Sequence, residues 1–209
     1  HGGIIEYQKE KCFSKIKSLI ESGSLGEVQY IYSNRLNLGT FRSDENVFWS
    51  FAPHDIAIFQ YLIDSDPVHI FSQGAAYVQK DLFDTTMTTL TYENNIHGHI
   101  YVSWLHSFKE HRLVLVGDKG MIHFDDSAEN KPLMMYDKSI DWEQGKPVKR
   151  DGPTEKINYE SGLPLTQELD YFLNHLSKPP AIANGKNGLS VVKILEHATH
   201  SMSQNHKNY

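Results

Sequence analysis

The sequence brings side chains capable of proton transfer together in the segment WSFAPHDI, residues 49–56. His54 and Asp55 follow Pro53, and proline is common in the first turn of a helix. This order predicts a helix that begins near Pro53 and carries His54 in its first turn. The helix dipole disfavours a positive charge there, so we expect a neutral imidazole that can accept a proton from a substrate hydroxyl. The alternative is that His54 only caps or packs against the helix start.

Polar residues before and after this segment are candidate substrate ligands. Arg35 and Asn37 share one face of an extended run, where they would supply a fork for a carboxylate and an amide for sugar hydroxyls. The structural alternative for this pair is a salt-bridged strand edge. Arg42, in the following loop, could meet a phosphate, although loop arginines are usually only solvated. His106 and Lys109 follow a strand, where they could line a ligand pocket, whereas their neighbour Trp104 is more typical of a core or an interface.

Composition excludes several other kinds of site. The twelve histidines are scattered, and His97 and His99 share a strand face without a third ligand, so we predict no metal site. Cys12 is the single cysteine and lies in a helical pattern, which indicates a buried thiol and fits a reducing compartment. A net charge of -6 without a long basic stretch argues against nucleic acid as a partner. No apolar run approaches membrane-spanning length, so we expect a cytoplasmic protein.

Hydrophobic spacing predicts two early helices, over 7–22 and from near Pro53 to 63, with an extended run over 26–39 between them. Strand signals rich in β-branched and aromatic residues follow at 68–78, 84–93, 96–105, 111–117 and 120–126. Tight turns are predicted at Asn94-Asn95 and at 118–120.

The rest of the chain predicts a polar loop over 127–162 with a possible strand at 132–137, then two helices. The first helix starts at Pro164, and the second runs from about Gly188 with Leu189, Val192, Leu195 and Ala198 on one face. Segregated strands and helices predict an α+β fold, an open, mostly antiparallel sheet with helices packed on one face. With 209 residues, 39% of them hydrophobic, we expect one domain over residues 1–209. Its open sheet face is expected to be covered by a partner subunit.

Two nucleotide-binding motifs do not occur in the sequence. There is neither a GxGxxG nor a GxxxxGK[ST] motif, and Gly117-Asp-Lys-Gly120 is expected to be a hairpin turn without a following helix. The chain also begins at His1 without a methionine, which we interpret as a start inside a longer protein.

Longer strings resemble the Gfo/Idh/MocA family of oxidoreductases. They are YIYSNRLNLG, ENVFWSFAPHDIAIFQYL, VSWLHSFKEHRLVLVG and the closing ELDYFLNHL and GLSVVKILE, and the resemblance spans about residues 4–200. It is strongest with the branch that oxidises the 3-hydroxyl of UDP-N-acetylglucosaminuronic acid for bacterial surface polysaccharides. In this family an N-terminal Rossmann domain binds NAD(P) and carries a Glu-Lys-Pro motif with a catalytic lysine. The C-terminal domain, an open antiparallel sheet, binds substrate and contacts other subunits.

The resemblance therefore implies that the chain matches only the C-terminal, substrate-binding and oligomerisation domain. NAD or NADP would be bound mainly by the absent N-terminal domain, no residue of this chain is assigned to the cofactor, and the isolated chain is expected to be inactive. His54 falls on the family's catalytic histidine. Ser50 stands where many members carry an aspartate, which favours the UDP-sugar branch and makes Ser50 another candidate substrate ligand.

The predicted function is thus NAD(P)-dependent oxidation of a sugar hydroxyl, with a sugar or nucleotide sugar as substrate and a homodimer or homotetramer as the assembly. A polyol or inositol-type dehydrogenase of the same family remains an alternative. So does a non-catalytic sugar-sensing or oligomerisation module, since one fold serves many functions.

Overall fold

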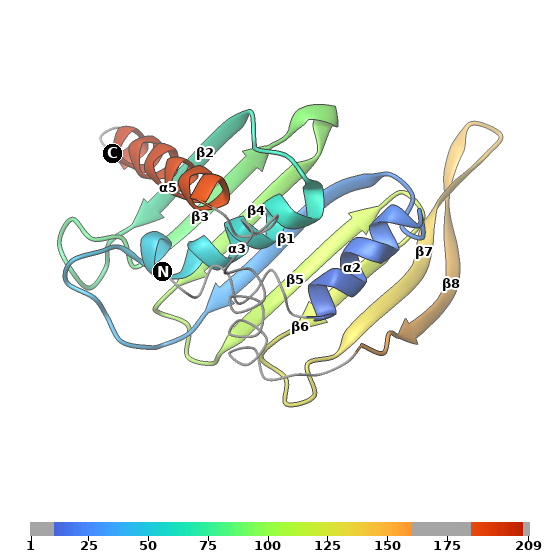
Figure 1. Ribbon diagram of the computed structural model, residues 1–209, viewed down its shortest axis with the longest axis horizontal. Coiled ribbons are helices and arrows are strands. Elements are labelled where there is room, and N and C mark those ends of the chain that lie inside the picture. The colour runs from blue at the N-terminus through green and yellow to red at the C-terminus, as the bar shows by residue number, and fades with distance from the viewer. Residues whose placement is uncertain (1–10, 160–184, 207–209) are drawn as a thin grey trace, which may run out of the picture.

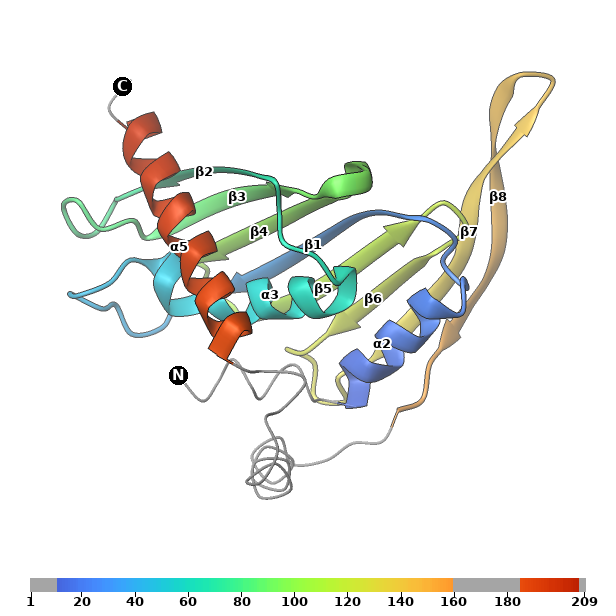
Figure 2. The ribbon, with the colours of Figure 1, turned by 45° about the horizontal axis from the view of Figure 1, so that its top comes forward.

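The computed structural model describes residues 11–159 and 185–206. Its centre is one eight-stranded sheet with the spatial order β2-β3-β4-β1-β5-β6-β7-β8. The strands are β1 Val28–Leu36, β2 His69–Ala75, β3 Thr85–Thr91, β4 His97–Ser103, β5 Glu110–Gly117, β6 Met121–Asp125, β7 Leu133–Glu143 and β8 Lys146–Lys156. Within the described residues, the helices α2 (Lys11–Glu21), α3 (Val47–Ile63) and α5 (Gly185–His206) all lie on one face of the sheet (Figures 1 and 2). The predicted fold class is confirmed.

Strand β1 lies at the centre of this sheet. It pairs with β4 in parallel and with β5 antiparallel, and every other neighbouring pair in the sheet is antiparallel. The chain between β1 and β4 passes through α3, β2 and β3, which supplies the long crossover that a parallel pair needs. In this register, Arg35 of β1 lies opposite His111 of β5.

Helix α3 begins earlier than the sequence pattern predicts, so the expected start near Pro53 is wrong. Asn46 caps it, because the Asn46 side-chain oxygen accepts hydrogen bonds from the amides of Phe48 and Trp49 at 3.0 and 3.2 Å. Pro53 lies inside the helix, where its ring removes a single backbone donor. His54 is consequently mid-helix, and the argument from the dipole at the helix start does not apply to it.

The other helices complete the core. α2 buries Cys12, Phe13 and Ile16, as expected from its spacing, while the predicted extension over 7–10 lies outside the described residues. The buried side chains of α5 are Val191, Ile194, Leu195, Ala198 and Met202. Of the face predicted for this helix, Leu195 and Ala198 are buried, whereas Leu189 and Val192 are exposed. The helix predicted from Pro164 falls outside the described part of the chain.

Two hairpin turns follow the sequence prediction, and one hairpin was not predicted. Asn94 and Asn95 both have positive φ, 63° and 60°, and the amide of Gly117 donates to the carbonyl of Gly120 at 2.9 Å. The stretch expected to be mainly a loop over 127–162 instead forms the long β7–β8 hairpin. β7 pairs with β6 only from Leu133 to Tyr136, so the rest of this hairpin projects beyond the sheet (Figure 1).

The sheet face opposite the helices is uncovered by any described element (Figure 2). Strand alternation places aromatic, aliphatic and polar side chains on it together. Its central members are Tyr30, Tyr32, Phe71, Met87, His97, His99, Tyr101, Val114 and His123. No helix in the described part of the chain is long and apolar enough to cross a membrane.

Candidate active site on helix α3

A buried ion pair joins helix α3 to the sheet. Arg35 Nε lies 2.8 Å from Asp55 Oδ2, and Arg35 Nη2 donates to Asp55 Oδ1 at 3.3 Å. Arg35 is 6% exposed and Asp55 3% exposed. The cavity beside the pair has a volume of about 10 Å³, which leaves room for one water at most. The guanidinium fork predicted to bind a substrate carboxylate is thus held by a carboxylate of the chain itself.

The ion pair continues into a wider polar network. Arg35 Nη1 lies 3.4 Å from His111 Nδ1, and this imidazole nitrogen lies 3.8 Å from Asp126 Oδ2. Lys131 Nζ lies 2.7 Å from Asp126 Oδ1. Burial opposes ionisation of Asp126, but the neighbouring His111 and Lys131 outweigh it and lower the pKa of Asp126 to about 2. The network therefore carries compensated charge at neutral pH.

The ion pair fixes the rotation of α3 about its axis, and with it the direction of His54. Asp55 points at the sheet, and the neighbouring His54 is turned by about 100° around the helix. Ser50 precedes His54 by four residues, so the two side chains share one helix face. Both are half-buried. The two residues therefore occupy one flank of the helix, beside the face that packs on the sheet.

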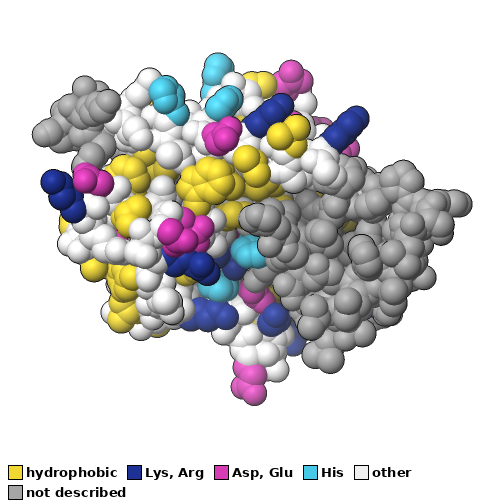
Figure 3. Space-filling model, turned by 60° about the vertical axis from the view of Figure 1, so that its left-hand side comes forward, with side chains coloured by type: hydrophobic (Ala, Val, Ile, Leu, Met, Phe, Trp, Pro, Cys, Tyr) yellow, Lys and Arg dark blue, Asp and Glu magenta, His cyan; other side chains and the backbone are white. Residues whose placement is uncertain are grey.

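Three loops meet at the end of the molecule where α3 begins. The amide of Val47 donates to the carbonyl of Phe83 at 3.0 Å, and the amide of Trp104 to the carbonyl of Asp84 at 2.9 Å. Trp104 also contacts the rings of Phe41 and Phe51, with centroids 5.7 and 6.4 Å apart. From this end, a band of hydrophobic side chains lies next to basic, acidic and histidine side chains (Figure 3).

Buried polar atoms in this region without a hydrogen-bond partner in the described structure include Trp104 Nε1, His106 Nε2 and Asp84 Oδ1. Such atoms are costly unless a ligand or water satisfies them. The His106 ring also packs on Phe108, with ring centroids 4.3 Å apart. Trp104 is fully buried, as predicted for a core residue.

The other predicted ligands are placed as follows. The backbone amide of Asn37 donates to the carbonyl of Ser103 at 3.1 Å, and the Asn37 side chain is half-buried. Arg42 is exposed and pairs with Glu45 at 3.0 Å. Lys109 is exposed, just before β5. No cluster of three or more potential metal ligands occurs among residues 11–159 and 185–206.

The sequence interpretation missed the partners of Arg35. A signal for Asp55 was present, because it lies on the buried stripe of α3. That stripe is Phe48, Ala52, Asp55, Phe59 and Leu62. A carboxylate on an inward stripe requires a buried cation, and Arg35 is the basic residue on a largely apolar strand. His111 and Asp126 had no such signal, since their proximity depends on strand register.

A sequence profile of the GFO/IDH/MocA C-terminal domain matches residues 13–123. The chain belongs to the GFO/IDH/MocA family. Its curated relative is the uncharacterized oxidoreductase YrbE of Bacillus subtilis, which is 27% identical over 92 residues, 39% of this chain and 27% of YrbE. This membership confirms the resemblance to an oxidoreductase family.

Solved structures of other proteins share the fold. UDP-N-acetylglucosamine 3-dehydrogenase GnnA from Acidithiobacillus ferrooxidans has a TM-score of 0.76 at 20% identity, covering 95% of this chain and 61% of that one. An aldose-aldose oxidoreductase from Caulobacter crescentus, complexed with glycerol, has a TM-score of 0.74 at 13% identity, covering 96% and 61%. The chain thus spans 61% of the length of these two structures.

Proposed function

We propose that this chain is the substrate-binding part of an NAD(P)-dependent dehydrogenase that oxidises a sugar hydroxyl, with the 3-hydroxyl of a UDP-N-acetylaminosugar acid as the first candidate. The observation that carries the proposal is the buried Arg35–Asp55 pair, which sets the rotation of α3 and so leaves the half-buried His54 and Ser50 together on a flank of the helix. In the family resemblance, His54 coincides with the catalytic histidine. The 3-dehydrogenase activity in the name of GnnA is compatible with the same substrate class.

Oxidation of a hydroxyl requires a group that removes the hydroxyl proton while the carbon-bound hydrogen leaves with its electron pair. A nicotinamide cofactor, when bound, accepts that hydride. In the proposal, the His54 imidazole exchanges the proton with the substrate hydroxyl. Ser50 and the half-buried His106 would orient the sugar by hydrogen bonds.

The described residues do not fit the cofactor itself. A dinucleotide needs a glycine-rich turn that leads into a helix N-terminus for its pyrophosphate. The full GxGxxG spacing does not occur in the sequence, and Gly117 and Gly120 close the β5–β6 hairpin and lead into a strand. In the proposal, the cofactor is therefore bound by another part of the protein.

The catalytic assignment is tested with His54→Asn in the full-length protein. We expect turnover to fall by about two to four orders of magnitude, the range for the loss of a general acid–base group, while the unfolding midpoint stays near that of the wild type. Steady-state rates from pH 6 to 9, with UDP-aminosugar acids as substrates, measure this effect. His69→Asn, which changes an exposed histidine on β2, is the matched control and should retain full activity.

Other outcomes would change the assignment. Near-normal turnover of His54→Asn across that pH range would return His54 to a structural role. Rapid oxidation of inositol instead of the UDP-sugar would identify a polyol dehydrogenase. Sugar binding without any turnover in the wild type would favour a non-catalytic sensing module.

A further inference from the structure

The buried anchor that joins α3 to the sheet contains a third side chain, His111 of β5. In the β1–β5 register His111 lies opposite Arg35. The Arg35 nitrogens Nε and Nη2 bond to the Asp55 carboxylate, while Nη1 lies 3.4 Å from His111 Nδ1. Because a guanidinium only donates hydrogen bonds, His111 Nδ1 is the acceptor in this contact and the ring hydrogen is on Nε2. His111 thus supports Arg35 at a nitrogen other than the two that bind Asp55.

The loop after β6 holds the His111 ring in place. The amide of Asp126 donates to the carbonyl of His111 at 2.8 Å, and the amide of His111 donates to Ser127 Oγ at 3.1 Å. Asp126 Oδ2 lies 3.8 Å from His111 Nδ1. The His111 side chain is 15% exposed. Backbone bonds at both its amide and its carbonyl, together with this low exposure, leave the ring few alternative rotamers.

The flank of α3 that carries His54 borders this group of residues. Ile58 lines the small cavity beside the ion pair, together with His111 and Asp126. His54 precedes Ile58 by four residues, so the two lie on one side of the helix, one turn apart. His54 also precedes Asp55 directly. A shift or rotation of α3 at Asp55 therefore moves the His54 imidazole with it.

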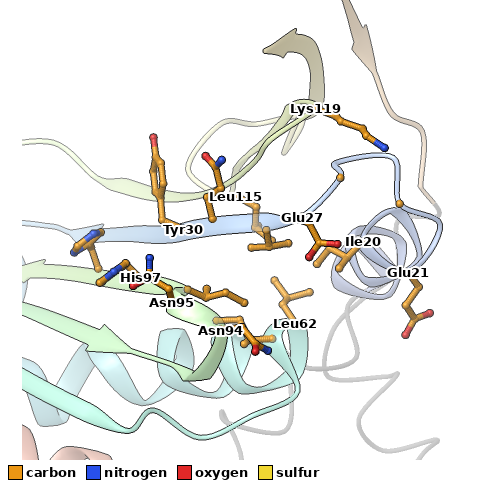
Figure 4. A pocket seen from close by; sticks show the side chains of 17 residues that line it. Ile20, Glu21, Glu27, Tyr30, Leu62, Asn94, Asn95, His97, Leu115 and Lys119 are labelled. Carbon is orange, nitrogen blue, oxygen red and sulfur yellow. The ribbon is translucent and has the colours of Figure 1, made fainter. Parts of the chain in front are cut away.

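Apolar packing sets the position of α3 less sharply than this polar anchor does. Apolar contacts are not directional, whereas hydrogen bonds depend on angle as well as on distance. At its C-terminal end α3 also borders a cavity of about 1050 Å³, which Leu62 and Ile63 line (Figure 4). Side chains that face open space lose contacts on that side, so the helix end is held less closely there. The bonds around Asp55 therefore fix the rotation of the helix.

We infer that His111 is a positioning residue for His54. It holds the Arg35 guanidinium in the orientation that Asp55 requires, and Asp55 sets the flank of α3 on which His54 lies. This inference rests on the proposed function, in which His54 exchanges a proton with the substrate hydroxyl. His111 acts through Arg35 and Asp55 and does not touch the substrate. Its loss should therefore lower turnover by misplacing His54, with little change in KM.

Three variants of His111 in the full-length protein test this role. His111→Leu removes the Nδ1 acceptor at similar volume, and His111→Asn places an amide oxygen near the position of Nδ1. His111→Gln reaches the position of Nε2 instead. With a UDP-aminosugar acid as substrate, we expect His111→Leu and His111→Gln to lower kcat about 10- to 100-fold, the cost of a misplacement of about 1 Å. His111→Asn should recover most of the lost kcat.

The matched control is His123→Leu. His123 is a half-buried histidine of the next strand, β6, and lies on the open face of the sheet, away from α3. This variant should keep the wild-type kcat. Equal losses of kcat in His111→Leu and His123→Leu, or equal values in His111→Asn and His111→Gln, would overturn the inference.

Amide hydrogen exchange supplies a second readout that needs no activity. Exchange of the α3 amides over residues 54–60 should be faster in His111→Leu than in the wild type, because the anchor that holds this turn is weakened. It should return toward the wild-type rate in His111→Asn. Unchanged exchange in His111→Leu would refute the inference whatever the substrate is. A wild type that oxidises no sugar, together with the expected exchange pattern, would reject the proposed function and still support the positioning of α3 by His111.

Discussion

The buried Arg35–Asp55 pair links helix α3 to the sheet and gives Arg35 a structural partner within the chain. Two charges buried at 6% and 3% exposure lose much of their hydration, and their mutual attraction must compensate for that loss. Such a pair adds little net stability compared with apolar residues. It does favour one rotation and one position of α3 where it packs on β1. Any other arrangement would leave a buried charge without its partner.

Removing one partner should therefore cost much more than removing both. Arg35→Met leaves the Asp55 carboxylate buried without its cation, and we expect the free energy of unfolding to fall by about 3–5 kcal/mol. Arg35→Met with Asp55→Leu should recover most of this loss. Urea unfolding of both variants measures the difference.

The matched control for that cycle is Arg42→Met, which breaks an exposed ion pair with Glu45. A loss of about 1 kcal/mol or less is expected there. If Arg35→Met costs no more than Arg42→Met, the buried pair does not hold α3 in place.

At the scale of elements, the start of α3 decides where His54 lies. The Asn46 side chain satisfies two of the amides that a helix start leaves without intrahelical partners. Because the helix starts at this cap, Val47 to Ala52 are helical and precede Pro53. His54 therefore lies beyond the first turn of the helix.

Loss of the cap should loosen this turn. We expect Asn46→Ala to lower the free energy of unfolding by about 1 kcal/mol, because the amides of Phe48 and Trp49 lose their acceptor. Asn46→Asp should keep the stability, since a carboxylate also caps and is favoured by the helix dipole. Thermal unfolding of the two variants separates the outcomes, and equal losses in both would show that packing, not the cap, sets the helix start.

The helices and hairpins could be predicted wherever one face is buried and the other exposed. The apolar stripe gave α2, and the turn residues at 94–95 and 118–120 gave two hairpins. Pro53 led to a wrong prediction of the helix start, because proline is common in the first turn of a helix. Here Asn46 caps the helix earlier in the chain, and Pro53 lies inside it. The β7–β8 hairpin escaped prediction because residues 141–149 are exposed on both faces, which erases alternation. Strand order and the Arg35–His111–Asp126 network depend on contacts between distant segments that a local pattern does not encode.

At the scale of the whole molecule, the open sheet face is a large surface without a covering layer in the described structure. Phe71 and Met87 are exposed on it, between tyrosines and histidines of the central strands. We expect the protein to be a dimer or a tetramer at low micromolar concentration, because apolar surface of this extent favours self-association.

Light scattering coupled to gel filtration measures that mass. Met87→Glu, in the middle of the open face, should reduce it, while Leu189→Glu, an equally exposed site on α5, should not. A monomer at every concentration would mean that water solvates the face and that the sheet contact is absent. Retention of the mass in Met87→Glu would show that the assembly uses another surface.

The central position of β1 also shapes how the chain is made. During synthesis β1 leaves the ribosome well before β4 and β5, so the backbone groups along its two edges have no partners until the intervening chain has been made. An unpaired strand edge recruits other strands. Neighbouring nascent chains on one messenger RNA should thus be most prone to pair with each other through residues 28–36 until residue 117 has emerged. Chaperone occupancy on the ribosome should peak in that interval.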